Sequence, residues 1–144
     1  MWMRLGDEAH QAVFSAHEAA VLQGSDAVEP EHFLLAFAEM PWSSAMRMLE
    51  SASVTGAAMR DHLTKLASGY PRLSKRPIDM ALAAKTKRII DLAYTVAKSR
   101  EDGMVGTEHL LLAIVKDGTG PGAGFLIESG ANLARLQEAL AELR

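Results

Sequence analysis

The residue pairs Glu31-His32 and Glu108-His109 are the strongest candidates for chemistry in this sequence, and each stands directly before an apolar run. A carboxylate accepts charge-assisted hydrogen bonds, and an imidazole hydrogen-bonds through both ring nitrogens or ligates a metal. For each glutamate we expect the main role to be complementing the dipole in the first turn of a helix, and the alternative is that it also contacts a ligand. We expect each histidine to tie its helix to the chain through a buried hydrogen bond rather than to bind a metal, because no His-Glu-x-x-His motif occurs.

No arrangement typical of catalysis accompanies these pairs. The sequence has no cysteine, and its serines and threonines, Thr107 included, lie outside any Gly-x-Ser-x-Gly motif. It also lacks the glycine-rich lysine motif that cradles nucleotide phosphates. We therefore expect a protein that is not an enzyme and that needs neither a cofactor nor a metal.

The composition predicts a globular protein. The 144 residues carry a net charge of −3, and 49% of them are hydrophobic. This charge gives no indication of a protein that binds nucleic acid or an anionic membrane, which would need a basic patch. No apolar run approaches the ~18 residues of a membrane span, and the N-terminus lacks the pattern of a signal peptide. We expect a cytoplasmic protein that binds neither nucleic acid nor membrane.

Helical periodicity dominates the segments that must position the two pairs. Apolar residues recur three and four positions apart, whereas strand-like alternation does not occur in the sequence. Pro30 suits the first turn of the helix that carries Glu31, and Gly106 or Thr107 suits the cap of the helix that carries Glu108. We predict a loop at 118–122 and helices at about 5–22, 30–40, 43–51, 55–67, 82–102, 107–116, 123–129 and 132–143.

The chain contains an internal repeat. Segment 28–37 recurs as 105–114, at an offset of 77 residues, and the same offset aligns apolar positions in the surrounding helices. We predict repeat one at 3–67, a linker rich in proline, glycine and basic residues at 68–78, and repeat two at 79–144. A unit of ~65 residues has a marginal core alone, so we expect two pseudo-symmetric four-helix repeats packed as one all-α domain over 1–144.

The two Val-x-x-Glu-His signatures, at 28–37 and 105–114, resemble that of the Clp N-terminal domain. This family is the double repeat at the front of Clp-type AAA+ unfoldases, and it has some short stand-alone members. The resemblance implies a non-catalytic module that docks substrates or adaptors, with Clp ATPase or protease subunits, adaptors and client proteins as partners. The alternative is a stand-alone helical regulatory or structural domain, such as an inhibitor or a ligand sensor, with no Clp role. The sequence contains no ATPase motif, so it is either a stand-alone member of the family or a part of a larger ATPase.

The resemblance also implies a binding site. In some members the glutamate of each signature contacts the guanidinium of a phosphorylated arginine on the client. A carboxylate accepts two parallel hydrogen bonds from a guanidinium, and a helix N-terminus offers N–H groups to a phosphate. By position, the implied partner-binding residues are Glu31, His32, Thr107, Glu108 and His109.

The two copies depart unequally from the family pattern. Many relatives open each repeat with an aromatic residue and a threonine, whereas this sequence has Leu5-Gly6 and Leu82-Ala83 there. Pro30 also removes an N–H from the first copy. The second copy, at residues 106–109, keeps the family's residues, so we expect it to be the better site.

Overall fold

The computed structural model describes residues 4–65 and 81–144, and within them eight helices and two very short strands. The prediction of an all-α fold is confirmed. The predicted linker at 68–78 and the repeat boundaries at 3, 67 and 79 lie outside the described residues. Along the chain the elements are β1 (Arg4–Leu5), α1 (Asp7–Leu22), α2 (Pro30–Ala38), α3 (Ser44–Ser51), α4 (Gly56–Thr64), α5 (Ala84–Ser99), β2 (Met104–Val105), α6 (Thr107–Asp117), α7 (Gly120–Glu128) and α8 (Leu133–Leu143).

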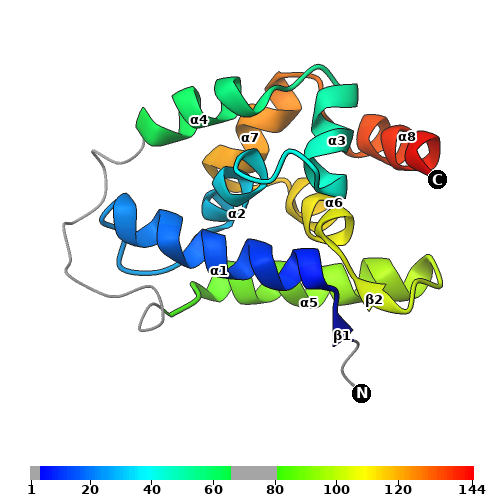
Figure 1. Ribbon diagram of the computed structural model, residues 1–144, viewed down its shortest axis with the longest axis horizontal. Coiled ribbons are helices and arrows are strands. Elements are labelled where there is room, and N and C mark those ends of the chain that lie inside the picture. Colours follow the sequence, from blue (N-terminus) through cyan, green and yellow to red (C-terminus); the bar gives the residue numbers. More distant parts are fainter. Residues whose placement is uncertain (1–3, 66–80) are drawn as a thin grey trace.

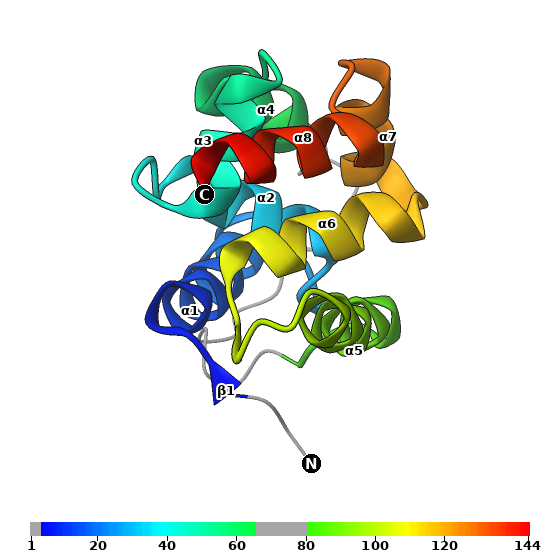
Figure 2. The same cartoon turned by 90° about the vertical axis from the view of Figure 1, so that its right-hand side faces the viewer.

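The helices form three levels, which Figures 1 and 2 show from two directions. Helices α1 and α5 lie at one side, α2 and α6 lie in the middle, and α3, α4, α7 and α8 cover the other side. Beyond their polar first turns the middle helices are largely apolar, and every residue of α2 is buried. One buried apolar cluster draws on both halves of the chain, so the starts of α2 and α6 are held by a shared core.

Helix α1 shows why the outer helices pack closely on this core. Its buried positions are all alanines, spaced three and four residues apart, which keeps one narrow stripe facing α2. Small side chains on that stripe let the two helix backbones approach each other. The alanines are Ala9, Ala12, Ala16 and Ala20, each 0% exposed.

Each half of the chain begins by pairing with the other half. Leu5 in β1 pairs in parallel with Val105 in β2, and Leu82 forms an isolated parallel bridge with Val28. At the offset of 77, Leu5 corresponds to Leu82 and Val28 to Val105. The two bridges are therefore one contact made twice, and each fixes the segment that leads into α6 or α2.

Two pairs of helix ends follow the same pseudo-symmetry, whereas α6 ends at left-handed Gly118 and its counterpart α2 ends at right-handed Glu39. Left-handed backbone follows α1 at Gly24 (φ 74°) and α5 at Glu101 (φ 61°), and it follows α3 at Ser53 (φ 67°) and α7 at Gly130 (φ 92°). Both pairs are related by the offset of 77. Glycine takes this conformation freely, whereas glutamate and serine take it against a steric cost, so the repeat geometry dominates over residue preference.

Three helix starts differ from the sequence prediction by two residues or more, and the third is that of α5, which begins at Ala84 rather than residue 82. Helix α7 begins at Gly120, so the loop predicted at 118–122 is wrong over its second half. Pro121 lies in the first turn of α7, where its missing N–H leaves no hydrogen bond unmade. Helix α1 begins at Asp7 rather than residue 5, because Leu5 is held in the strand pair.

Within the described residues, no single helix is long and apolar enough to cross a membrane. Helices α6 and α7 are long and apolar enough only when they are counted together, and the angle between them at the break is 91°.

Candidate functional site

The start of α6 is organised by a buried histidine. The N–H of Gly106 donates to Nδ1 of His109 over 2.8 Å. Since Nδ1 accepts, Nε2 carries the proton and donates to Oδ2 of Asp102 over 2.7 Å. His109 is 1% exposed, and it ties α6 to the turn that follows α5. The interpretation of this histidine as a buried hydrogen-bonding group is confirmed.

The start of α2 has the same histidine with a different partner. The N–H of Glu29 donates to Nδ1 of His32 over 2.8 Å, and Nε2 bonds to the amide oxygen of Gln23 at 3.1 Å. The amide nitrogen of Gln23 donates onward to the carbonyl of Leu63. Burial lowers the pKa of His32 to about 4. The first copy is thus a neutral network, whereas the second ends on a carboxylate.

Thr107 faces the core rather than the solvent. It is 0% exposed, and its hydroxyl oxygen accepts the N–H of Ala45 over 3.1 Å. This contact ties the first turn of α6 to the first turn of α3, across 62 residues of sequence. A ligand-binding role for Thr107 stays a prediction.

A cavity of about 400 Å³ opens beside the start of α6. It lies between the first turn of α1, the turn after α5, and the starts of α3 and α6. Glu108 and His109 line it, whereas Glu31, His32 and Thr107 do not. The carboxylates among its lining residues are Asp7, Glu8, Asp102 and Glu108.

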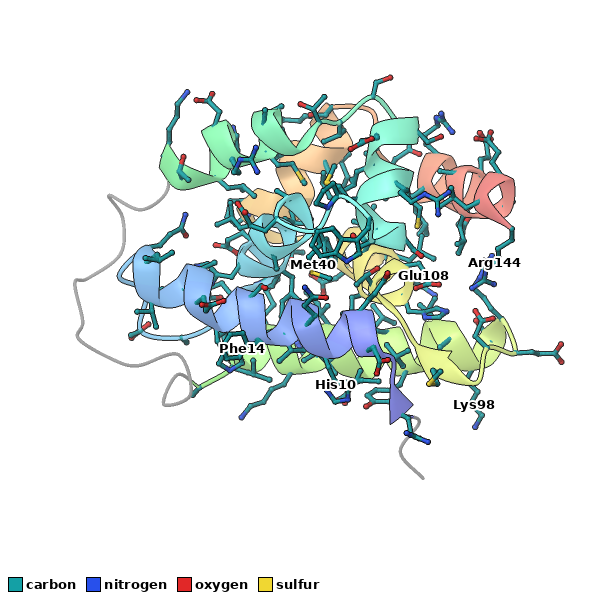
Figure 3. All side chains as sticks on the ribbon, viewed as in Figure 1. His10, Phe14, Met40, Lys98, Glu108 and Arg144 are labelled. Carbon is teal, nitrogen blue, oxygen red and sulfur yellow. The ribbon has the colours of Figure 1, made fainter. Side chains whose placement is uncertain are left out.

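The guanidinium of Arg144 lies on two of these carboxylates. Nη1 and Nη2 donate to the two oxygens of Asp102 over 3.2 and 3.0 Å, and Nη2 donates to Glu108 over 3.4 Å. Figure 3 shows Arg144 at the end of α8 and Glu108 at the start of α6 on the same side of the molecule. The hydrogen bond to Asp102 raises the pKa of Arg144. Burial works against ionisation of Asp102, but the hydrogen bonds from Arg144 and His109 hold its pKa below the ordinary value.

Asp102 and Arg144 were not predicted from the sequence as site residues. Asp102 precedes its histidine by seven residues, whereas Gln23 precedes His32 by nine. The two acceptors therefore do not align at the repeat offset. The sequence signal for Asp102 was its position as an acidic residue in the turn just before the second Val-x-x-Glu-His signature.

Gly106 explains why the Glu108 carboxylate lies where it does. A Cβ at Gly106 would lie 1.9 Å from Oε1 of Glu108 and 2.8 Å from its Cδ. The carboxylate therefore occupies the space that a side chain at position 106 would need. At the offset of 77, the first copy has Glu29 at this position, so Glu31 has no equivalent space.

Glu31 is covered instead by another helix. Glu31 is buried, at 6% exposure, whereas Glu108 is only half-buried. A Cβ at Gly122, in the first turn of α7, would lie 3.3 Å from both Cα and Cβ of Glu31. Burial, together with the charges of Glu31 and Asp26, also raises the pKa of neighbouring Glu29. Within the described residues, the glutamate of the first copy thus packs against α7, whereas the glutamate of the second copy lines an open cavity.

Comparison with known proteins agrees with this architecture. Residues 4–142 match the family described as Clp repeat (R) N-terminal domain. Chaperone protein ClpB of Oceanobacillus iheyensis is 24% identical over 144 residues, which cover 99% of this chain and 17% of ClpB. Uncharacterized protein Rv2667 of Mycobacterium tuberculosis is 28% identical over 136 residues, 93% of this chain and 51% of that protein. The chain thus spans about half or less of these relatives.

A solved structure shows the same fold. The Hsp104 N-terminal domain from Candida albicans superposes with a TM-score of 0.79 at 20% identity, covering 98% of this chain and 91% of that one. The family match spans nearly the whole sequence and includes both Glu-His signatures. This chain belongs to the Clp repeat N-terminal domain family.

Proposed function

We propose that this chain is a non-catalytic module that receives substrates or adaptors for a Clp-type AAA+ unfoldase or protease. We place its ligand site in the acidic cavity at the start of α6, with Glu108 and Asp102 as the groups that bind a guanidinium. The observation that supports this site most strongly is the Arg144 guanidinium, which bonds to Asp102 through two nitrogens and reaches Glu108. Paired hydrogen bonds of this kind select arginine over lysine.

The charges around the cavity favour an unmodified arginine over a phosphorylated one. Asp7 and Glu8, in the first turn of α1, line the same cavity as Asp102 and Glu108. A phosphoryl group would add up to about two negative charges, and like charges a few ångströms apart repel in a partly desolvated site. Gly6 lines the cavity without a hydroxyl that could donate to a phosphate. Phospho-arginine recognition therefore stays the less favoured form of this proposal.

The proposed site is tested by titration with three peptides. Calorimetry would compare Gly-Gly-Arg-Gly-Gly, its phospho-arginine form and Gly-Gly-Ala-Gly-Gly, all with blocked termini. Glu108→Gln should weaken binding of the unmodified arginine peptide about tenfold, because the acceptor at position 108 loses its negative charge and the hydrogen bond to the guanidinium is no longer between two charged groups. Glu128→Gln is the matched control, since Glu128 is exposed at the end of α7 and does not line the cavity. Equal affinity for the arginine and alanine peptides would contradict the proposal.

The link to a Clp machine needs a separate test. A chimera would carry this chain in place of the N-terminal domain of a Clp-type unfoldase, and the rate of ATP-dependent client degradation would be measured. We expect the chimera to degrade an arginine-rich client faster than the unfoldase without an N-terminal domain, and Glu108→Gln to remove the gain. No gain for any client would favour the regulatory or ligand-sensing alternative.

A further inference from the structure

We infer that Arg144 is a ligand tethered to its own site, which occupies the acidic cavity and competes with an arginine of the partner. This inference rests on the proposed function, because it describes how that same site is regulated. Arg144 contacts both carboxylates that we assign to the partner's guanidinium, Asp102 and Glu108. A partner arginine cannot bond to the same oxygens until this guanidinium leaves.

The ion pairs of Arg144 with Asp102 and Glu108 are exposed enough for another guanidinium to replace that of Arg144. The Arg144 side chain is 43% exposed, whereas Asp102 and Glu108 are 23% and 17% exposed. The carboxylates are therefore held in the cavity, while much of the arginine remains in water. Ion pairs with this exposure favour the paired state by about fivefold at most, so the guanidinium leaves the cavity readily.

Helix α8 does not depend on Arg144 for its position. Leu136 and Leu140 are buried in the core, and the guanidinium of Arg135 donates to the carbonyl of Ser51. Ser51 also donates to Glu142 over 3.3 Å. Because these contacts anchor α8 against α3, the Arg144 side chain can leave the cavity by rotation of its own bonds while the helix stays in place.

Charge balance explains why the cavity is occupied when no partner is bound. Among its described lining residues, Arg144 is the one lysine or arginine, beside four carboxylates. Its departure leaves Asp102 and Glu108 facing each other across a partly buried space, which favours entry of another cation. Exchange of one guanidinium for another conserves this charge, so the partner arginine displaces Arg144 rather than binding beside it.

Occupancy and competition are tested by two measurements on the 144-residue chain. The first is carboxyl carbon NMR titration of Asp102 in wild type and Arg144→Ala. The second is calorimetric titration with N-acetyl-arginine amide. Arg144→Ala should shift the Asp102 titration to higher pH and tighten binding about two- to sixfold, because the cavity is no longer partly occupied by a competing guanidinium.

Arg88→Ala is the matched control for net charge. Arg88 is exposed near the start of α5, about 20 Å along the helix from Asp102, so neither measurement should change. An unchanged Asp102 titration in Arg144→Ala would overturn occupancy of the cavity. A shifted titration with equal or weaker binding would overturn competition alone. Failure of both proteins to bind the ligand would reject the proposed function and, with it, the competition.

Discussion

Replacing Gly106 with alanine should displace the Glu108 carboxylate and little else. The three atoms nearest to a Cβ at position 106 all belong to the Glu108 side chain, the closest being Oε1 at 1.9 Å. Gly106 has φ −105° and ψ −179°, which is extended backbone that alanine adopts without strain. Its N–H to His109 uses only the backbone. The substitution therefore tests the position of one carboxylate.

The size of the effect follows from this geometry. Because real Cβ contacts are not shorter than 3.0 Å, Oε1 of Glu108 must retreat by more than 1 Å, which removes its contact with a guanidinium in the cavity. A hydrogen bond between charged groups contributes roughly 1.5–3 kcal/mol, and partial exposure places this one at the lower end, so affinity should fall about tenfold. Alanine is a poorer N-cap than glycine by roughly 0.5–1 kcal/mol, but it restricts the unfolded chain by a similar amount. The free energy of unfolding should change by less than about 1 kcal/mol.

Calorimetry with the arginine peptide and urea unfolding would measure both quantities. Gly103→Ala is the matched control, because Gly103 lines the same cavity and a Cβ there would have no neighbour within 4 Å. Unchanged affinity in Gly106→Ala would refute the placement of the Glu108 carboxylate at the site. An equal loss in both variants would show that bulk at the cavity wall, rather than displacement of Glu108, weakens binding.

Three further predictions concern the framework around the site. Gly122→Ala should lower the free energy of unfolding by about 1–3 kcal/mol, because its Cβ would lie 2.9 Å from a buried leucine of α2. Gly124→Ala is the control: its Cβ would have no neighbour within 4 Å, so it should raise the free energy of unfolding by up to about 1 kcal/mol. Urea unfolding would measure both variants. Thr107→Val leaves the N–H of Ala45 without its acceptor and should cost about 1–3 kcal/mol, whereas Thr107→Ser should retain most of the stability in the same assay. Because burial lowers the pKa of His32 to about 4, against 6.5 ordinarily, the unfolded chain binds the proton first. The free energy of unfolding should therefore fall as the pH is lowered from 6.5 to 4. Urea unfolding at each pH and NMR titration of the His32 ring would measure this fall, and a free energy that does not change over this range would contradict the prediction.

The helices could be predicted because apolar residues recur with the helical period, and the repeat could be predicted because the same pattern returns later in the sequence. The offset of 77 aligns the apolar positions, and even the left-handed positions Gly24 and Glu101 obey it. The pairing of Leu5 with Val105 could not be predicted in this way. It joins two residues far apart in sequence, and a two-residue strand has no periodicity of its own. The start of α7 was missed because Pro121 and its glycines suit a loop as well as a first helical turn.

The candidate site was predictable in its histidines but not in their partners. At the offset of 77, Gln23 corresponds to Arg100, and a guanidinium has no acceptor to offer to an imidazole N–H. His109 therefore bonds to Asp102, which lies in the turn two residues further along. With a carboxylate in place of an amide as the acceptor, the network of the second copy is charged, whereas that of the first copy is neutral. A repeat comparison that assumes constant offset assigns the wrong partner.

The fold is nearly symmetric, but the two sites have different chemistry, so the number of ligands bound is itself informative. Glu31 lies beneath the first turn of α7, whereas Glu108 lies beside a glycine and an open cavity. We therefore expect calorimetry to give one arginine peptide per chain. A stoichiometry of two would mean that α7 moves off Glu31 in solution, and Gly122→Ala, which crowds that contact, would then change the affinity of one of the two sites. A stoichiometry of one, with an affinity that Glu108→Gln weakens about tenfold and Glu31→Gln leaves unchanged, would assign binding to the second repeat alone.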